Sequence, residues 1–87
     1  MKKVNWNEEK AALIKKMRDI DLERVATMIE ENKILEVKKS HHRTNQKVFA
    51  LQYDDYIIAV PFVETDHEIF IKTAFRSRKL QKRLKME

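Results

Sequence analysis

The sequence predicts a small α+β domain in which two N-terminal helices and a short, basic C-terminal helix pack on one face of a four-stranded antiparallel sheet. Apolar residues recur at helical spacing up to residue 30 and then alternate, or run together, over residues 35–75. Short turns separate these later runs, which favours hairpins and therefore antiparallel pairing. A chain of 87 residues suffices for a single domain, residues 1–87.

Two helices are expected before the sheet. The first begins at Asn5 or Asn7 and ends near Met17. Its expected buried side consists of apolar residues at helical spacing, namely Trp6, Leu13, Ile14 and Met17. The second begins after Asp21, whose carboxylate can accept the amide protons of the first turn. It ends before Asn32, which can take the left-handed conformation that glycine usually adopts.

The expected strands follow at residues 35–39, 48–53, 56–63 and 69–75. Asp54 and Asp55 form the turn between the second and third strands. The third strand is almost wholly apolar, which predicts a central strand buried on both faces. Pro61 cannot donate a hydrogen bond to a ladder, so a bulge or a late position is expected there. Ser77 is the expected cap of the last helix.

The composition excludes several classes of protein. Without cysteine there is no disulfide, thiolate zinc site or cysteine nucleophile. Without glycine there is no P-loop, dinucleotide-binding fingerprint or helix–loop–helix calcium site. No apolar run approaches the ~18–20 residues that span a bilayer, and the N-terminus lacks the apolar core of a signal peptide. A cytoplasmic location without a membrane partner is therefore expected.

The positive charge is concentrated in two segments. The net charge is +5 and the sequence pI is about 9.6. Residues 1–37 are neutral overall, whereas residues 38–47 carry four Lys or Arg and no acid. Residues 48–71 carry five acids and no Lys or Arg, and residues 72–87 carry seven Lys or Arg against one acid. If the fold brings the two basic segments together, they form one face suited to a polyanion such as RNA.

RNA is the nucleic acid that such a chain could cleave without a metal. Its 2′-OH is an internal nucleophile, so a base, an acid and cations around the phosphorane suffice. Adjacent histidines in an extended segment point to opposite sides, so neither a metal nor a cofactor is expected. The candidate catalytic residues are His41, His42, Lys72, Arg76 and Arg78. The candidate RNA-binding residues are Lys38, Lys39, Arg43, Lys47 and Lys79, with Tyr53 and Tyr56 as candidates to stack a base.

The chain also resembles a known family. Its N-terminal segment WNEEKAALIKKMRDIDLE resembles the Trp-Asp-x-x-Lys-Ala pattern of BrnT-type toxins, and its C-terminal segment EIFIKTAFRSRK resembles their last strand and Ser-Ala-Arg-Lys turn. Arg78 then matches an arginine that acts at phosphate, and Gln46 falls where the family has a glutamate. The resemblance implies a RelE-like fold and a metal-independent endoribonuclease that is the toxin of a type II toxin–antitoxin pair. It also implies a cognate antitoxin as partner, in a heteromer or beside a homo-oligomer.

Two other interpretations stay open at the level of the sequence. The same basic face could belong to a non-catalytic RNA- or protein-binding module that acts electrostatically. It could also belong to a structural domain whose partner is an acidic protein. The distribution of charge is compatible with all three.

Overall fold

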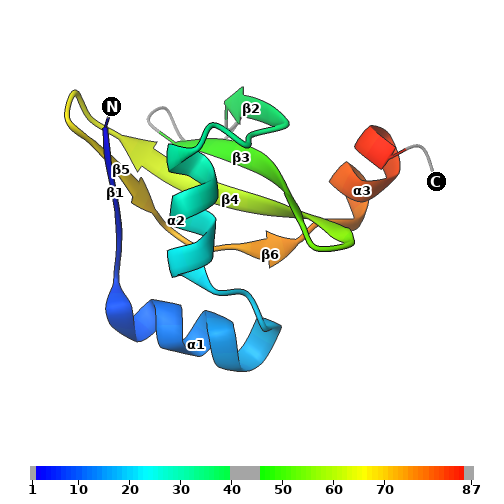
Figure 1. Ribbon diagram of the computed structural model, residues 1–87, viewed down its shortest axis with the longest axis horizontal. Helices are drawn as coiled ribbons and strands as arrows, with labels where there is room; N and C mark the ends of the chain where they lie inside the picture. The colour runs from blue at the N-terminus through cyan, green and yellow to red at the C-terminus, as the bar shows by residue number, and fades with distance from the viewer. Residues whose placement is uncertain (1, 40–45, 86–87) are drawn as a thin grey trace.

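The computed structural model describes residues 2–39 and 46–85 and confirms the α+β class. Figure 1 shows α2 in front of the sheet, α1 below it and α3 at one end. In chain order the elements are β1 (Lys3–Trp6), α1 (Glu8–Arg18), α2 (Leu22–Glu30), β2 (Glu36–Lys39), β3 (Gln46–Tyr53), β4 (Tyr56–Glu64), β5 (Glu68–Ile71), β6 (Phe75–Arg76) and α3 (Arg78–Lys85). Among the described residues, no helix is long and apolar enough to cross a membrane.

The strands form one sheet in the order β1-β5-β4-β3-β2, with β6 paired to the start of β4. The predicted strands appear as β2, β3, β4 and the pair β5–β6, and they are antiparallel as expected. The prediction missed β1, which pairs with β5 in parallel, Lys3 opposite Glu68. Four residues of mixed polarity give no local strand signal, and the partner strand lies far along the chain.

Asparagine and aspartate fix the ends of the N-terminal helices and the turns. The Asn7 side chain accepts a hydrogen bond from the Lys10 amide and caps α1, and Asp21 caps α2 in the same way, as predicted. Asp19, Asn32 and Asp54 have φ of 55°, 59° and 56°. These residues tolerate the left-handed conformation, so the chain makes its tight turns without glycine.

The main core lies between the sheet and the two N-terminal helices. Residues opposite each other on paired strands point to the same face, so the register assigns each side chain to a face. The rings of Phe49 and Phe62 stack on this side, with centroids 3.9 Å apart. We call it the closed face; its strand residues include Phe49, Leu51, Val60, Phe62 and Ile71, all buried.

The opposite side of the sheet is only partly covered. Its buried residues Ala50, Ile57 and Ala59 lie outside the main core cluster. The helix α3 contacts β4 here, and the Ile57 amide donates to the Gln81 side chain over 3.0 Å. The expectation that all helices share one face is therefore wrong for α3. We call this side the open face; its strand residues include Glu36, Lys38, Val48, Ala50, Ile57, Ala59, Pro61, Glu68, Phe70 and Phe75.

The expected buried side of α1 is confirmed for Ile14 and wrong for Leu13 and Met17, while Trp6 packs half-buried against the core from outside the helix. Trp6 belongs to β1, and only Ile14 is buried in α1. Leu13 is 60% exposed and Met17 75% exposed. Because α1 lies beyond the end of the strands rather than across them, only one flank of the helix meets the core (Figure 1).

Candidate nucleic-acid interface

The register of the sheet aligns two predicted lysines in one row across the open face. Lys38 of β2 pairs with Val48 of β3, and Val48 pairs with Pro61 of β4. The Lys72 amide donates to the Pro61 carbonyl over 2.8 Å, so Lys72 completes the row. Three strand spacings separate the two lysines, about 14 Å between their backbones. Both lysine side chains are exposed.

The row ends at Lys72 because β1, the next strand, stops at Trp6 opposite Ile71, and Pro61 leaves Lys72 without one backbone donor. The N–H and C=O groups of one strand residue point to the same neighbouring strand, so the missing donor of Pro61 faces Lys72. Ladder pairing of β4 with β5 stops at Ile71 and resumes with β6 at Phe75. Lys72 therefore lies where the edge of the sheet is interrupted. Its Nζ lies 6.0 Å from the centroid of the Phe70 ring on the same face.

Arg76 lies apart from Lys72, although the sequence placed both at one phosphate. In β6 it is opposite Ile58, which belongs to the main core cluster on the closed side. Its guanidinium donates to the carbonyl of Arg18 at the end of α1. Arg18 in turn donates to the Thr73 hydroxyl over 3.1 Å and to the Ala74 carbonyl over 3.0 Å. Arg76 thus ties α1 to the sheet and does not share the row with Lys72.

Arg78 and Lys79 are exposed residues in the first turn of α3. The Ser77 hydroxyl accepts from the Leu80 amide over 3.2 Å, so the predicted cap is confirmed. The far end of the helix is fixed by Arg83, which makes a bidentate pair with Glu36 of β2 at 2.8 and 2.5 Å. The helix therefore carries its cations along one border of the open face.

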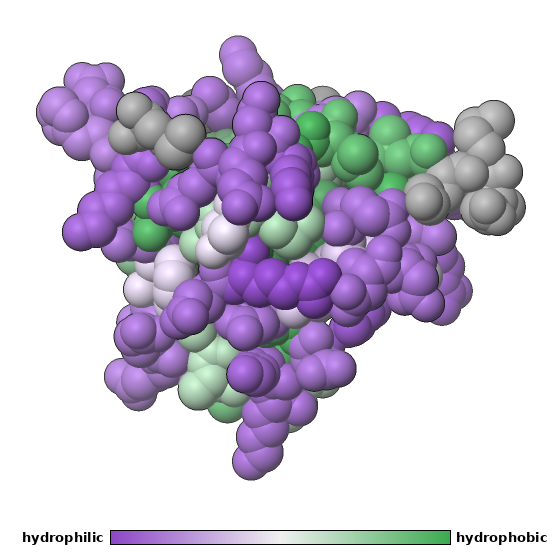
Figure 2. Space-filling view, in the orientation of Figure 1, coloured by the Kyte–Doolittle hydropathy of each residue, from purple (hydrophilic) through white to green (hydrophobic). Residues whose placement is uncertain are grey.

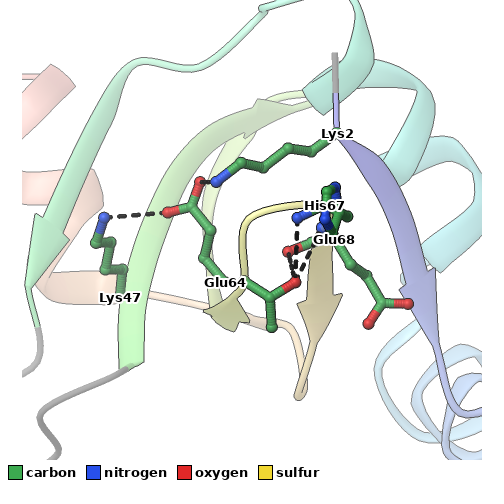
Figure 3. A network of polar contacts seen from close by, with 6 residues as sticks. Lys2, Lys47, Glu64, His67 and Glu68 are labelled. Atoms are coloured by element: carbon green, nitrogen blue, oxygen red, sulfur yellow. Dashed lines mark hydrogen bonds and ion pairs between the residues drawn. The ribbon is translucent and has the colours of Figure 1, made fainter.

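Lys47 is engaged in an ion-pair network on the closed side (Figure 3). Its ammonium lies 3.1 Å from the carboxylate of Glu64, which also binds Lys2 at 2.7 Å. Hydrogen bonds from Lys2 and then Lys47 hold the pKa of Glu64 below its ordinary value. Lys39 lies opposite Lys47 in the register and is exposed. Lys39 and Lys47 therefore lie on the closed face, opposite the row that contains Lys38.

Three predicted residues, His41, His42 and Arg43, lie outside the described residues. The proton-transfer groups of the predicted mechanism thus have no described position. Within residues 2–39 and 46–85, no group of three or more His, Asp or Glu side chains could hold a metal ion.

Phe70 and Phe75 are aromatic residues of the open face that could meet a base, and the sequence indicated neither of them. Tyr53 is buried; its hydroxyl accepts from the Asp21 amide over 3.0 Å, and Arg24 lies 4.1 Å above its ring. Phe70 is half-buried on the open face beside Lys72. Pro61 is the residue in the sequence that points to this site. A proline has no N–H to donate to the neighbouring strand, so pairing weakens at the end of β5, beside Phe70.

The described part of the open face can attract and orient a polyanion. Lys38 and Lys72 project from the sheet, and Arg78, Lys79 and Lys82 are exposed on α3. Its strand carboxylates Glu36 and Glu68 are already engaged, by Arg83 and by the side-chain amide of Asn5. Such a surface binds phosphates through lysine and arginine and leaves the half-buried Val48 and Phe70 for apolar contact.

No protein-family model matches this chain, and no curated protein matches it. Its function is therefore inferred from the chemistry of the open face.

Proposed function

We propose that the protein binds single-stranded RNA on its open face and cleaves it without a metal, as the toxin of a toxin–antitoxin pair. The observation that supports this proposal is the row Lys38–Val48–Pro61–Lys72. Two exposed cations about 14 Å apart can meet separate phosphates of one strand. The half-buried ring of Phe70 lies beside Lys72, on the side of the row away from α3, and offers a surface for a base.

The proposed reaction needs only acid–base catalysis and charge stabilisation. A base removes the proton of the 2′-OH, and the oxygen attacks the adjacent phosphorus. An acid protonates the departing 5′-oxygen, which leaves a 2′,3′-cyclic phosphate and a free 5′-hydroxyl. His41 and His42 remain the predicted acid and base. Lys72 and Arg78 are the cations proposed for the phosphorane, because Arg76 is held by the Arg18 carbonyl.

The test is cleavage of single-stranded RNA in excess EDTA between pH 5 and 8. The wild-type protein should cleave, and Lys72→Ala should slow cleavage about tenfold or more while the protein stays folded. Lys33→Ala is the matched control, because Lys33 is exposed, pairs with Glu31 and lies away from the row. Cleavage that requires an added divalent ion would rule out the proposed mechanism.

Arg78 gives a second and sharper test. Loss of one group that stabilises charge in a transition state typically costs 10²–10³-fold in rate. Arg78→Ala should therefore slow cleavage about a hundredfold, with little change in RNA affinity. Lys82→Ala, an exposed cation one turn further along α3, should have a mild effect. Equal effects of the two substitutions would make Arg78 an ordinary surface charge.

A non-catalytic RNA-binding module is the second candidate. It is favoured by the described residues of the open face, whose strand carboxylates Glu36 and Glu68 are both engaged, by Arg83 and by the side-chain amide of Asn5. RNA binding that is retained without cleavage at any pH would support this candidate. Growth arrest on expression, relieved by Lys72→Ala, would support the toxin.

A further inference from the structure

A groove of about 850 Å³ lies between α1 and the end of β5. Its apolar lining comes from Leu13, Ile14 and Met17 on the helix and from Phe70 and Ile71 on the strand. Leu13 and Met17 are one helical turn apart and largely exposed, whereas Ile14 anchors the helix in the core. Apolar surface is visible at the lower edge of the molecule, where α1 lies (Figure 2). The groove therefore presents apolar side chains from both of its walls on a largely hydrophilic protein.

Cations border this groove on both walls. Lys10 and Arg18 lie near the two ends of α1, and Lys72 lies on the opposite wall, against the single carboxylate of Glu9. The guanidinium of Arg18 is held in place by its hydrogen bonds to Thr73 and Ala74. The groove thus combines an apolar floor with a net positive rim, and part of that rim is fixed before any partner arrives.

We propose that this groove is the docking site for an amphipathic helix of an acidic partner protein. The apolar side chains of such a helix, spaced three and four residues apart, would cover Leu13, Met17 and Phe70. Carboxylates beside them would pair with the cations of the rim. The helix α1 has 11 residues and is about 16 Å long, which matches a docked helix of about three turns.

Charge distinguishes this occupant from a second copy of the chain. Two copies joined through the same groove would bring three cations of one protomer against three of the other. Like charges facing each other across an apolar contact oppose association. An acidic helix would instead neutralise these cations, because its carboxylates are opposite in charge to the rim of the groove.

Lys72 belongs both to this groove and to the row on the open face. A docked acidic helix would occupy Lys72 and cover Phe70, so RNA and the helix should compete. This competition rests on the proposed function, whereas the docking itself does not.

The test uses two synthetic peptides of 16 residues with the same Leu stripe at helical spacing. Glutamate fills the outward positions beside the stripe in one peptide, and lysine fills them in the other. Binding to the full chain is measured by fluorescence anisotropy and by backbone chemical shifts in NMR. The acidic peptide should bind and shift the resonances of α1 and β5, and the basic peptide should not.

Two substitutions localise the site. Met17→Glu should weaken the acidic peptide at least tenfold without loss of fold, because Met17 is 75% exposed. Leu35→Glu is the matched control, an exposed apolar residue outside the groove, and should leave binding unchanged. Lack of binding, equal binding of both peptides, or shifts elsewhere would overturn the proposal. If sedimentation shows that the protein self-associates and Met17→Glu abolishes this self-association, the groove binds a second copy of the chain. That result would also overturn the proposal.

Displacement of labelled RNA by the acidic peptide tests the competition. If the peptide displaces RNA less effectively from Lys72→Ala than from the wild type, Lys72 contacts both ligands. If RNA does not bind at all, the proposed function fails while the peptide result still decides the docking site.

Discussion

The two faces of the sheet differ in how completely they are covered. On the closed face, Phe49, Leu51, Val60 and Phe62 are 5% exposed or less, and α2 lies across this face (Figure 1). On the open face, α3 covers the end that contains Ala50 and Ile57, while Val48 and Phe70 remain half-buried.

This difference assigns stability and binding to opposite sides of one sheet. Burial of large apolar side chains is the main favourable contribution to folding, and it is concentrated on the closed face. The open face buries Ile57 and small apolar residues under α3, and its exposed lysines contribute little to the core. Substitutions of the exposed residues of this face should change what the protein binds and leave the fold intact.

The largest effect should come from matched phenylalanines on the two faces. Phe62→Ala removes a ring that is 1% exposed and stacked on Phe49, so it should lower the free energy of unfolding by about 3–5 kcal/mol. Phe70→Ala removes a half-buried ring and should cost clearly less. Urea denaturation of both variants measures the difference. Similar losses would show that the open face is part of the core.

The lysine row should produce an intermediate effect, on binding rather than stability. Replacing both Lys38 and Lys72 by alanine should reduce the slope of log K against log salt for single-stranded RNA by roughly 1.4, about 0.7 for each phosphate that a lysine no longer neutralises. Unfolding should be nearly unchanged, because both side chains are exposed. A salt titration followed by fluorescence provides the measurement, and an unaltered slope would place RNA elsewhere.

The smallest effect should come from the network around Glu64 at the rim of the closed face. Its pKa is lowered in the folded state by Lys2 and Lys47, so the carboxylate stabilises the fold above its ordinary pKa. That contribution disappears as the pH falls through the lowered pKa. Glu64→Gln should therefore cost up to about 1 kcal/mol near pH 7 and progressively less in acid.

Denaturation of the wild type and of Glu64→Gln across pH 3–7 measures this convergence. A difference between the two proteins that does not change with pH would mean that the carboxylate acts through packing alone.

Local signals in the sequence predicted most of the fold. The caps at Asn7 and Asp21 and the left-handed Asn32 depend on neighbouring residues, which the sequence displays directly. The strand β1 depends on a partner far along the chain, so its short segment carried no signal of its own. The exposed side of α1 was missed for a related reason, since helical spacing alone does not reveal what a helix packs against.

The candidate site could be predicted only as a set of residue types. Charge segregation selected Lys38 and Lys72, and both are exposed on one face, whereas alternation along the strands places Lys47 on the other face. Arg76 has the same residue type as Arg78 and lies two positions away, yet it is held by a backbone carbonyl of α1. Such an interaction depends on tertiary geometry, which composition and spacing do not contain.

The parallel pairing of β1 with β5 has a consequence for the order of folding. Lys3 and Glu68 are neighbours in space but 65 positions apart in sequence, whereas β3 and β4 meet through a tight turn. Closing the longer loop costs more chain entropy, so the hairpin should form early and β1 should join last. A substitution such as Val4→Ala should then accelerate unfolding and leave the folding rate nearly unchanged. The edge of the sheet beside the groove would be the first part of the molecule to open.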